Sequence, residues 1–186
     1  PRGDGGGLIR IEASGNVLVN GVLTANGRSQ GNRCGPGSGG GIYVRCSTFA
    51  GTNGLVSANG GDGWLGQGAG GGGGGRIAIL YTNTAAQSVL PPPRVRFSAL
   101  GGYGRYGAAG GFDFTGSECG DLGALYLPDT AILDPDWMAH SCQLIVPGFT
   151  GWSVDRLTVS NGWLRIPRDG FSLTVADDLT VMGAVG

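Results

Sequence analysis

The chain has no lysine, so all 12 of its cationic side chains are arginines. This absence excludes a phosphate-binding P-loop and a Schiff-base lysine as the basis of its function. His140 is the only histidine, which excludes a metal site built from several histidines of this chain. Apolar runs are short, and none reaches the roughly 18 residues that cross a bilayer as a helix. The sequence therefore predicts no membrane span, no metal site and no cofactor.

Charge is scarce as well. Charged residues make up 13% of the chain, about half the share of an average protein, and the formal net charge is −1. A protein that binds nucleic acid usually presents a basic surface, so no nucleic-acid partner is expected. Hydrophobic residues nevertheless amount to 40%, whereas a disordered chain combines low hydrophobicity with high net charge. The chain should therefore fold.

Glycine is in excess, at 41 of 186 residues, or about 22% against the usual ~7%. The glycines have no three-residue period along the sequence, which excludes collagen. Many lie in runs, of which 70–75 is the longest, and ordering such a run costs much backbone entropy. Because the runs recur at the same place in each repeat, we expect them to lie side by side, packed backbone against backbone, rather than as mobile loops.

Internal repeats organise the N-terminal half of the chain. A glycine run that leads into a short apolar segment occurs three times, and its third glycine falls at positions 7, 41 and 75, a spacing of 34. A second apolar segment follows each run, and its first two copies are 33 residues apart. Towards the C-terminus, apolar–polar–apolar triplets follow closely, and Leu157 to Leu179 closes a cycle of 22 residues. The segments are 5–11, 39–45 and 73–79 for the first element, 21–27, 54–60 and 94–101 for the second, 123–127 for a weaker fourth copy of the first, and 157–159, 164–166, 173–175 and 179–181 for the triplets.

These short segments predict an all-β chain. Runs rich in Val, Ile, Leu and Thr, bounded by Gly and Asn-Gly, are typical of β-strands. We predict a parallel β-solenoid (β-helix) with glycine-rich loops, in which each coil buries its apolar residues against its neighbours. An antiparallel β-sandwich is the alternative, since Asn-Gly also forms two-residue hairpins. Three parts are expected: glycine-rich repeats with a period of about 34 residues over 1–81, an irregular insertion or lobe over 82–150, and a coil of short strands over 151–186.

Four cysteines occur without a CxxC pair, and with one histidine they make a poor zinc set. Two disulfides are the preferred interpretation, with three possible connectivities, and they imply an oxidising compartment. The chain also begins at Pro1 without a signal peptide, so we expect a mature product or a segment of a longer protein. The cysteines are Cys34, Cys46, Cys119 and Cys142.

Few residues suggest catalysis or ligand binding. Asp134 and Asp136 would face the same way in an extended segment, with His140 nearby in sequence, but a capped turn is the expected role of this pair. The tryptophans could stack on sugar rings, although core or interface packing is more common for this residue. We therefore expect no catalytic residues and no enzyme. The tryptophans are Trp64, Trp137, Trp152 and Trp163.

Two short motifs carry weaker alternatives. Arg2-Gly3-Asp4 resembles an integrin-binding tripeptide, which would make the chain an adhesin. Asp4 and Asp62 lie among glycines, as in calcium-binding glycine–aspartate repeats, but those repeats recur in tandem and these do not. Chance matches are common in glycine-rich sequence, so neither motif is expected to be functional.

The glycine-rich segment 54–61, the glycines before 76–79 and the coil-like stretch 154–181 resemble the glycine-rich β-helix segments of very large bacterial cell-surface and secreted proteins. The likeness covers about 5–80 and 150–186. It implies an adhesin-like or fibre-like protein, although the same fold hosts pectin-degrading enzymes. The paired Asp and Arg or Lys residues of those enzymes have no evident match in this sequence. A function taken from a fold alone would rest on analogy.

A solenoid has two open ends, each with unpaired backbone N–H and C=O groups. Here both ends carry strand-like sequence without an obvious cap. We therefore predict an extracellular or cell-surface structural protein that assembles with itself into a filament by stacking end to end. The alternative is a β-helix module that binds or cleaves an extracellular polysaccharide. The predicted assembly edges are Leu8, Ile9 and Ile11 at the start and Leu179 and Val181 at the end.

Overall fold

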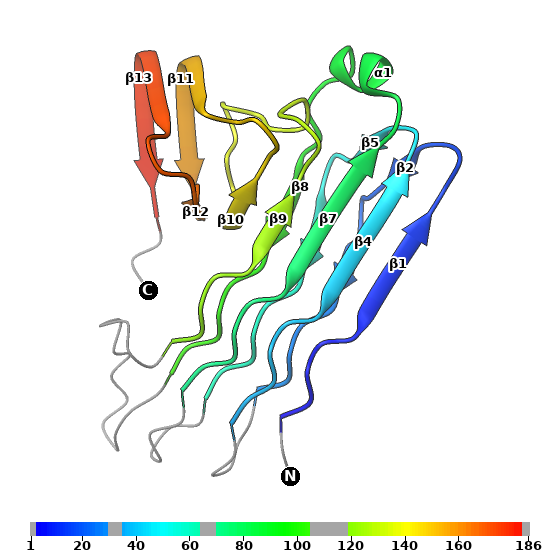
Figure 1. The fold of residues 1–186 in the computed structure, drawn as a ribbon, viewed down its shortest axis with the longest axis vertical. Helices are drawn as coiled ribbons and strands as arrows, with labels where there is room; N and C mark the ends of the chain where they lie inside the picture. The colour runs from blue at the N-terminus through cyan, green and yellow to red at the C-terminus, as the bar shows by residue number, and fades with distance from the viewer. Residues whose placement is uncertain (1–2, 30–34, 64–69, 105–118, 184–186) are drawn as a thin grey trace.

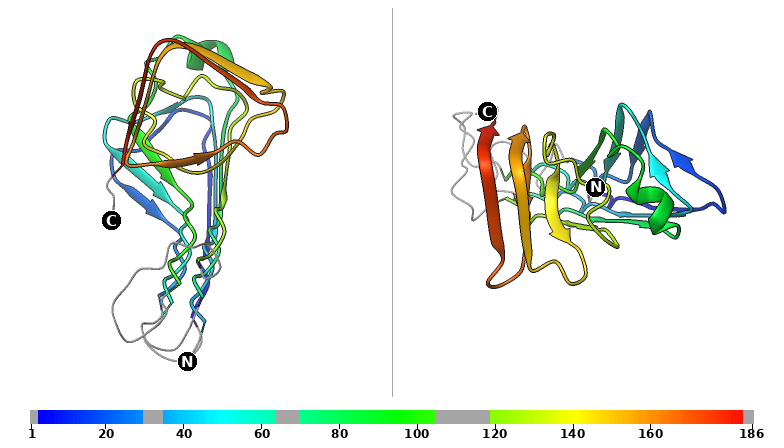
Figure 2. Two further views of the ribbon diagram at one scale, coloured as in Figure 1. Left: turned by 90° about the vertical axis from the view of Figure 1, so that its left-hand side faces the viewer. Right: turned by 90° about the horizontal axis from the view of Figure 1, so that it is seen from above.

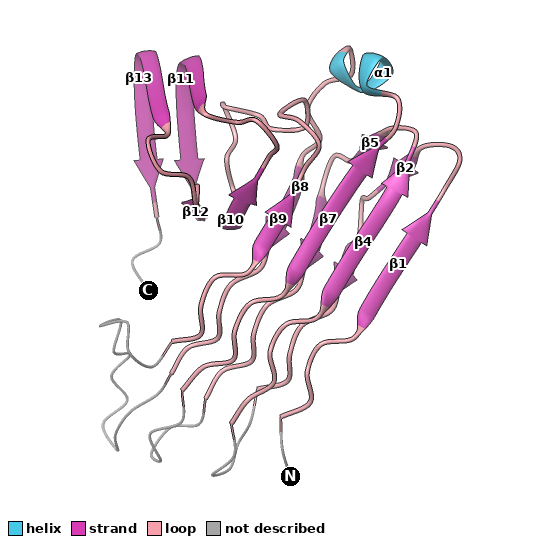
Figure 3. Ribbon diagram, viewed as in Figure 1, coloured by secondary structure: helices cyan, strands magenta, loops and turns pink. Residues whose placement is uncertain are grey.

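Figure 1 shows the computed structural model, which describes residues 3–29, 35–63, 70–104 and 119–183. Strands dominate, and one five-residue helix is present within the described residues (Figure 3). The elements are β1 (Leu8–Glu12), β2 (Val17–Leu18), β3 (Val22–Thr24), β4 (Gly41–Cys46), β5 (Phe49–Ala50), β6 (Gly54–Ser57), β7 (Arg76–Tyr81), α1 (Thr84–Ser88), β8 (Val95–Ser98), β9 (Ala124–Tyr126), β10 (Ser141–Ile145), β11 (Gly151–Ser160), β12 (Trp163–Arg165) and β13 (Ser172–Met182).

All strand pairs of the described chain are parallel, which overturns the alternative of an antiparallel sandwich. The largest sheet follows the order β1-β4-β7-β9-β10-β8-β6-β3 and curls into a half-barrel. Its two halves meet in β10, where Ser141 lies opposite Ser98 of β8 and Gln143 lies opposite Ala124 of β9. The chain is therefore all-β, parallel and solenoid-like.

We call each passage of the chain around this body a coil. Coils 1 and 2 each hold three strands, and from coil 4 onwards the return to the next coil is direct (Figure 2). Coil 1 comprises β1–β3, coil 2 β4–β6, coil 3 β7, α1 and β8, coil 4 β9 with the stretch 138–141, coil 5 the end of β10 with β11, and coil 6 β12 with β13. Strands of the stretch 82–150 thus belong to the same sheet as those of the repeats.

Ladders of inward apolar side chains build the core. One ladder runs through five coils in register, and its members from coil 2 onwards are buried. Full burial of such a side chain contributes about 1.5–3 kcal/mol each, so the alternation of apolar and polar residues fixes the strands. The ladder consists of Ile9, Ile42, Ile77, Leu125 and Leu144.

The register corrects the repeat spacing that the sequence indicates. A uniform spacing of 34 would place Ile42 opposite Leu8 and Arg76. In the structure Ile42 lies opposite Ile9 and Ile77, at offsets of 33 and 35. A one-residue slip turns every side chain to the other face of a strand, so burial of the isoleucines overrides the alignment of the glycine runs.

In coil 3, α1 takes the place that the middle strand holds in coils 1 and 2 (Figure 3). Gln87 of this helix is buried, and its side-chain amide acts like a strand backbone. Its Oε1 accepts a hydrogen bond from the Phe49 N–H at 2.7 Å, and its Nε2 donates to the Phe49 carbonyl at 3.1 Å. The helix thus satisfies the backbone of β5 without a strand of its own.

A glycine-rich arm projects from the body and consists of two columns of extended backbone (Figure 2, left). Its hydrogen bonds follow a three-residue period. The N–H of Gly39 donates to Gly73 of the following coil, that of Gly40 donates to Ala25 across the arm, and that of Gly41 donates to Gly7 of the preceding coil. This period is typical of polyproline II-type backbone with three residues per turn. The arm comprises 3–7, 35–40, 70–75 and 119–123 in one column and 25–29, 58–63 and 99–104 in the other.

Close approach, rather than unusual backbone angles, requires glycine in the arm. Within the described chain only Gly148 and Gly170 have positive φ among the glycines, and neither belongs to the arm. A Cβ added to Gly40 or Gly75 would come closer than 3.0 Å to a carbonyl oxygen of the preceding coil. The expectation that the glycine runs pack backbone against backbone is therefore confirmed for most of the described arm glycines, whereas Gly7, Gly35 and Gly73 have open space around them.

Candidate functional site

The first coil leaves one end of the body open. β1, β2 and β3 each pair with a strand of coil 2, and their other edges have no strand partner among the described residues. Between these strands lies a hollow of about 220 Å³. Ile11, Val17 and Leu23 line it, and each is only partly buried although it packs against the core. Coil 1 therefore lacks the cover that coils 2–5 receive.

The last coil leaves the opposite end open. Leu179 and Val181 of β13 lie in register with Leu157 and Val159 of β11, so they continue the inward ladders. Nothing in the described chain covers them, and they are 56% and 70% exposed. The hollow at this end measures about 330 Å³. Both ends thus present unfinished core.

Within the described residues neither hollow contains an inward-pointing charge, one of the usual protections of an exposed sheet edge, although β13 carries another, a register shift between Val175 and Asp178. The side chains that line the two hollows, among them Val19, Asn20, Trp152 and Leu173, include no charged group within the described residues. Of the predicted edge residues, Ile9 and Ile11 point inward and pack, partly buried, against the core. Leu8 instead points outward beside Gly41, and it is 77% exposed.

The carboxylates considered for catalysis form ion pairs. Asp134 lies 3.1 Å from Arg94, and Asp136 lies 3.8 Å from Arg156. The Asp134 side chain also accepts a hydrogen bond from the Asp136 N–H at 3.0 Å, as in a capped turn. Arg94 further stacks over Trp137, at 5.3 Å from the ring centre. The two carboxylates are therefore held by cations and a turn.

His140 does not join these carboxylates through any hydrogen bond of the described chain. Its ring is buried against Phe97, and its Nδ1 accepts a hydrogen bond from the Phe97 N–H at 3.3 Å. Burial, and then the positive charge of Arg96, lower the pKa of His140 to about 4. The imidazole is therefore neutral at pH 7 and acts as part of the core.

The tryptophans do not form one platform. Trp152 and Trp163 line the hollow at the open C-terminal end, with Trp163 65% exposed. Trp137 lies elsewhere, edge-on to His140 at 5.9 Å. Trp64 lies outside the described residues.

The two expected disulfides are absent from the described chain, where Cys46, Cys119 and Cys142 are free. Cys34 lies outside the described residues. Cys46 and Cys142 are separated by β7 and β9 in the sheet, so their Cα atoms are at least ~14 Å apart at ~4.8 Å per strand, whereas a disulfide needs Cα atoms within about 7 Å. Both thiols are buried, and burial raises their pKa, for Cys142 to about 12. These cysteines serve as small apolar residues.

The two aspartates considered for calcium have structural partners. Asp4 forms an ion pair with Arg28, and Asp62 accepts a hydrogen bond from the Tyr103 N–H at 2.9 Å. Arg2 of the Arg2-Gly3-Asp4 motif lies outside the described residues. The described residues contain no group of three side chains suited to hold a metal ion, and no helix among them has the length and apolar character of a membrane span.

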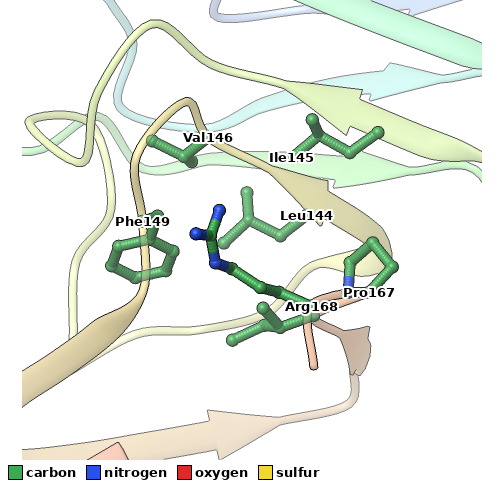
Figure 4. A pocket seen from close by; sticks show the side chains of 7 residues that line it. Leu144, Ile145, Val146, Phe149, Pro167 and Arg168 are labelled. Carbon is green, nitrogen blue, oxygen red and sulfur yellow. The ribbon is translucent and has the colours of Figure 1, made fainter. Parts of the chain in front are cut away.

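Two other hollows lie on the sides of the body. The smaller, of about 120 Å³, has aliphatic walls from Leu144 and Val146, and Arg168 lies across it beside Phe149 (Figure 4). That volume is below the roughly 300 Å³ of a typical ligand pocket. The larger, of about 510 Å³, lies over the outer face of β7, β9 and β10, where Arg76, Tyr126 and Gln143 surround small residues.

The asparagines whose side chains join neighbouring coils were not identified from the sequence. Asn26 accepts a hydrogen bond from the Asn59 N–H at 2.7 Å, and Asn20 accepts one from the Thr52 N–H at 2.8 Å, each in the next coil. The Asn-Gly pairs at 26 and 59 lie 33 residues apart, which is the signal that could have found the first contact.

No family model, no curated protein and no solved structure matches the chain.

Proposed function

We propose that the chain is a parallel β-solenoid segment of an extracellular fibre and that its copies stack end to end through their open coils. The observation that carries this proposal is the pair of uncovered ends. Each combines parallel strand edges that have no partner within the described residues with an uncharged, mainly apolar hollow.

Coil 1 of one copy binds coil 6 of a second copy. Coil 1 exposes the preceding edge of parallel strands and coil 6 exposes the following edge, so the two are complementary in strand direction. A contact between different ends of identical subunits does not close on itself, and it yields a filament. The proposed extracellular location rests on the resemblance to surface proteins. The described cysteines add no support, since they form no disulfide.

The test compares wild-type protein with Val181→Lys by electron microscopy and sedimentation at high concentration. A lysine at this inward position would bury an unpaired charge in the contact, so we expect wild-type filaments and a loss of filaments in the variant. Thr180→Lys is the matched control, because Thr180 is the neighbouring exposed residue of β13. Compact wild-type monomers at every concentration would refute the proposal.

A second candidate, a polysaccharide-binding module, is favoured by the hollow on the outer face of the body. Its volume of about 510 Å³ falls within the range of ligand pockets. Tyr126 offers an aromatic face, and Arg76 has no carboxylate partner within the described residues, which suits an acidic sugar. Titration with polygalacturonate and with neutral dextran tests this candidate. Binding of the acidic polymer alone, lost in Arg76→Gln, would support it, and equal failure of both polymers would dismiss it.

A further inference from the structure

The two ends of the arm differ from its interior in residue type. In the first column, glycines 37, 72 and 120 occupy equivalent positions in successive coils. A Cβ on any of them would come closer than 3.0 Å to a carbonyl oxygen of the preceding coil. In the second column, Gly61 and Gly102 are constrained in the same way. Interior positions that face the preceding coil therefore exclude side chains.

Coil 1 breaks this pattern at one position in each column, whereas Gly7, the equivalent of Gly40 and Gly75, keeps it. Asp4 holds the position equivalent to Gly37, because a Cβ on Gly37 would meet the Asp4 carbonyl. Arg28 holds the position equivalent to Gly61 for the same reason. Their side chains start where the backbone of a preceding arm segment would have to lie. The two form an ion pair of 3.6 Å across the end of the arm, and the Arg28 N–H donates to the Asp4 carbonyl at 2.9 Å.

The other end of the arm is closed by coil 4. Here the relevant positions are those that face the following coil, where Gly39 and Gly74 would bring a Cβ closer than 3.0 Å to its backbone. By the register of β7 with β9, the equivalent residue of coil 4 is Leu122. Gln143, from a coil that has no arm, donates its Nε2–H to the Leu122 carbonyl at 2.8 Å. That carbonyl is thereby satisfied without a further glycine segment.

We infer that the arm is a finite lattice closed at both ends, and that the end-to-end contact is confined to the body. This inference rests on the proposed function and names the matching surfaces: coil 1 of one copy receives the armless coil 6 of a second copy. Coils 5 and 6 return directly, without an arm, so a copy stacked on coil 1 leaves the space beside Asp4 and Arg28 free. Repeat proteins commonly stop their own propagation with such altered terminal units.

The structure of the fibre distinguishes the two possible contacts. Six coils at ~4.8 Å each give an axial rise of about 29 Å per copy, with arms separated by two armless coils. Direct contact between arms would require neighbouring copies to be displaced sideways, because coils 5 and 6 already occupy the space that follows coil 4 in the body. A rise of about 29 Å with coil 1 seated on coil 6, measured by cryo-electron microscopy, supports the inference. Filaments in which the arm of one copy contacts the arm of the next overturn it and leave self-assembly intact.

A second experiment tests closure of the arm without relying on filaments. In the Val181→Lys background, Asp4→Gly combined with Arg28→Gly removes both side chains from the end of the arm. We expect self-association that rises with concentration in sedimentation velocity, because an unprotected glycine edge can receive another backbone. The charge-swapped pair, Asp4→Arg with Arg28→Asp, keeps both Cβ atoms and should stay monomeric. A double-glycine variant as monomeric as the swapped one would overturn closure by this pair, whatever the wild-type protein assembles into.

Discussion

In the body, side chains such as Phe49, Phe97 and Leu125 fill the space between coils and are fully buried, whereas in the arm the backbones themselves meet. The same chain alternates between the two regions three times, since each of the first three coils leads into a stretch of arm. The body gains stability mainly from apolar area removed from water. The arm has little such area, and its order depends on backbone hydrogen bonds in three directions.

This difference predicts opposite responses to substitution. Removing atoms should harm the body, because a close-packed interior cannot refill a cavity. Adding atoms should harm the arm, because a new Cβ has backbone rather than a flexible side chain to displace. The two regions can therefore be distinguished by whether loss or gain of a methyl-sized group is tolerated.

Phe97→Ala should have the largest effect. Phe97 is fully buried, and its ring packs against Phe49 and His140. Truncation of such a residue costs about 4 kcal/mol, which chemical denaturation monitored by circular dichroism can measure. Val89→Ala is the control, because Val89 is exposed at the end of α1 and its truncation should be nearly neutral. Equal losses in the two variants would mean that the body is not held together by its side-chain core.

Acid should weaken the body next. Burial, followed by the charge of Arg96, lowers the pKa of His140 to about 4 in the folded state, against 6.5 in the unfolded chain. The unfolded chain therefore binds the proton first as the pH falls. The contribution of His140 to the free energy of unfolding is fully present above pH 6.5. It falls as the pH falls, and about 3 kcal/mol has been lost near pH 4.

The pH dependence is measured by denaturation of wild-type protein and His140→Gln between pH 7 and 4. In the variant, the free energy of unfolding should fall less steeply between pH 6.5 and 4 than in the wild type, whatever its value at pH 7. Parallel slopes in the two proteins would assign the acid sensitivity to other groups.

Gly75→Ala should destabilise the arm by about 2 kcal/mol, the usual cost of overpacking. A Cβ on Gly75 would overlap backbone atoms of Gly39 and Gly40. Gly73→Ala is a matched control only two residues away, because a Cβ there meets nothing within 4 Å. Hydrogen exchange of the arm amides should quicken in the first variant and stay unchanged in the second. Equal behaviour would show that the glycines are not required by close approach.

The body was more predictable from sequence than the arm. The offset of 33 between the second repeat segments is the register of β3 with β6, and the 22-residue cycle from Leu157 to Leu179 is the register of the second half of β11 with β13, after a register shift. Alternating apolar residues encode such pairings because burial selects one face. Glycine has no side chain that could mark one face of a strand. Aligning the glycine runs therefore gave a spacing of 34, whereas Ile42 is offset by 33 and 35 from its partners.

The candidate site was predictable only in part. Open ends follow from any solenoid without caps, and Leu179 and Val181 could be read from their triplet. The cysteine prediction failed because it depended on composition, while the positions of Cys46 and Cys142 are set by strand order. The closure of the arm could not be foreseen at all. Asp4, Arg28 and Leu122 acquire their meaning only once the register shows which glycines they replace.

The smallest effect should come from Arg28→Gln. The Asp4–Arg28 pair is exposed to solvent, at 71% and 79% for the arginine and aspartate side chains, and such pairs contribute little to stability. We expect the free energy of unfolding to change by less than about 0.5 kcal/mol.

Arg94→Gln is the counterpart in the body, where Arg94 pairs with the mostly buried Asp134 and stacks on Trp137, so its loss should be the greater. Since the closure that we infer depends on the volume at position 28 and not on its charge, Arg28→Gln should also leave the arm closed and the protein no more prone to associate than the wild type. A large loss of stability in Arg28→Gln would instead make the ion pair a structural support of the arm and weaken its interpretation as a cap.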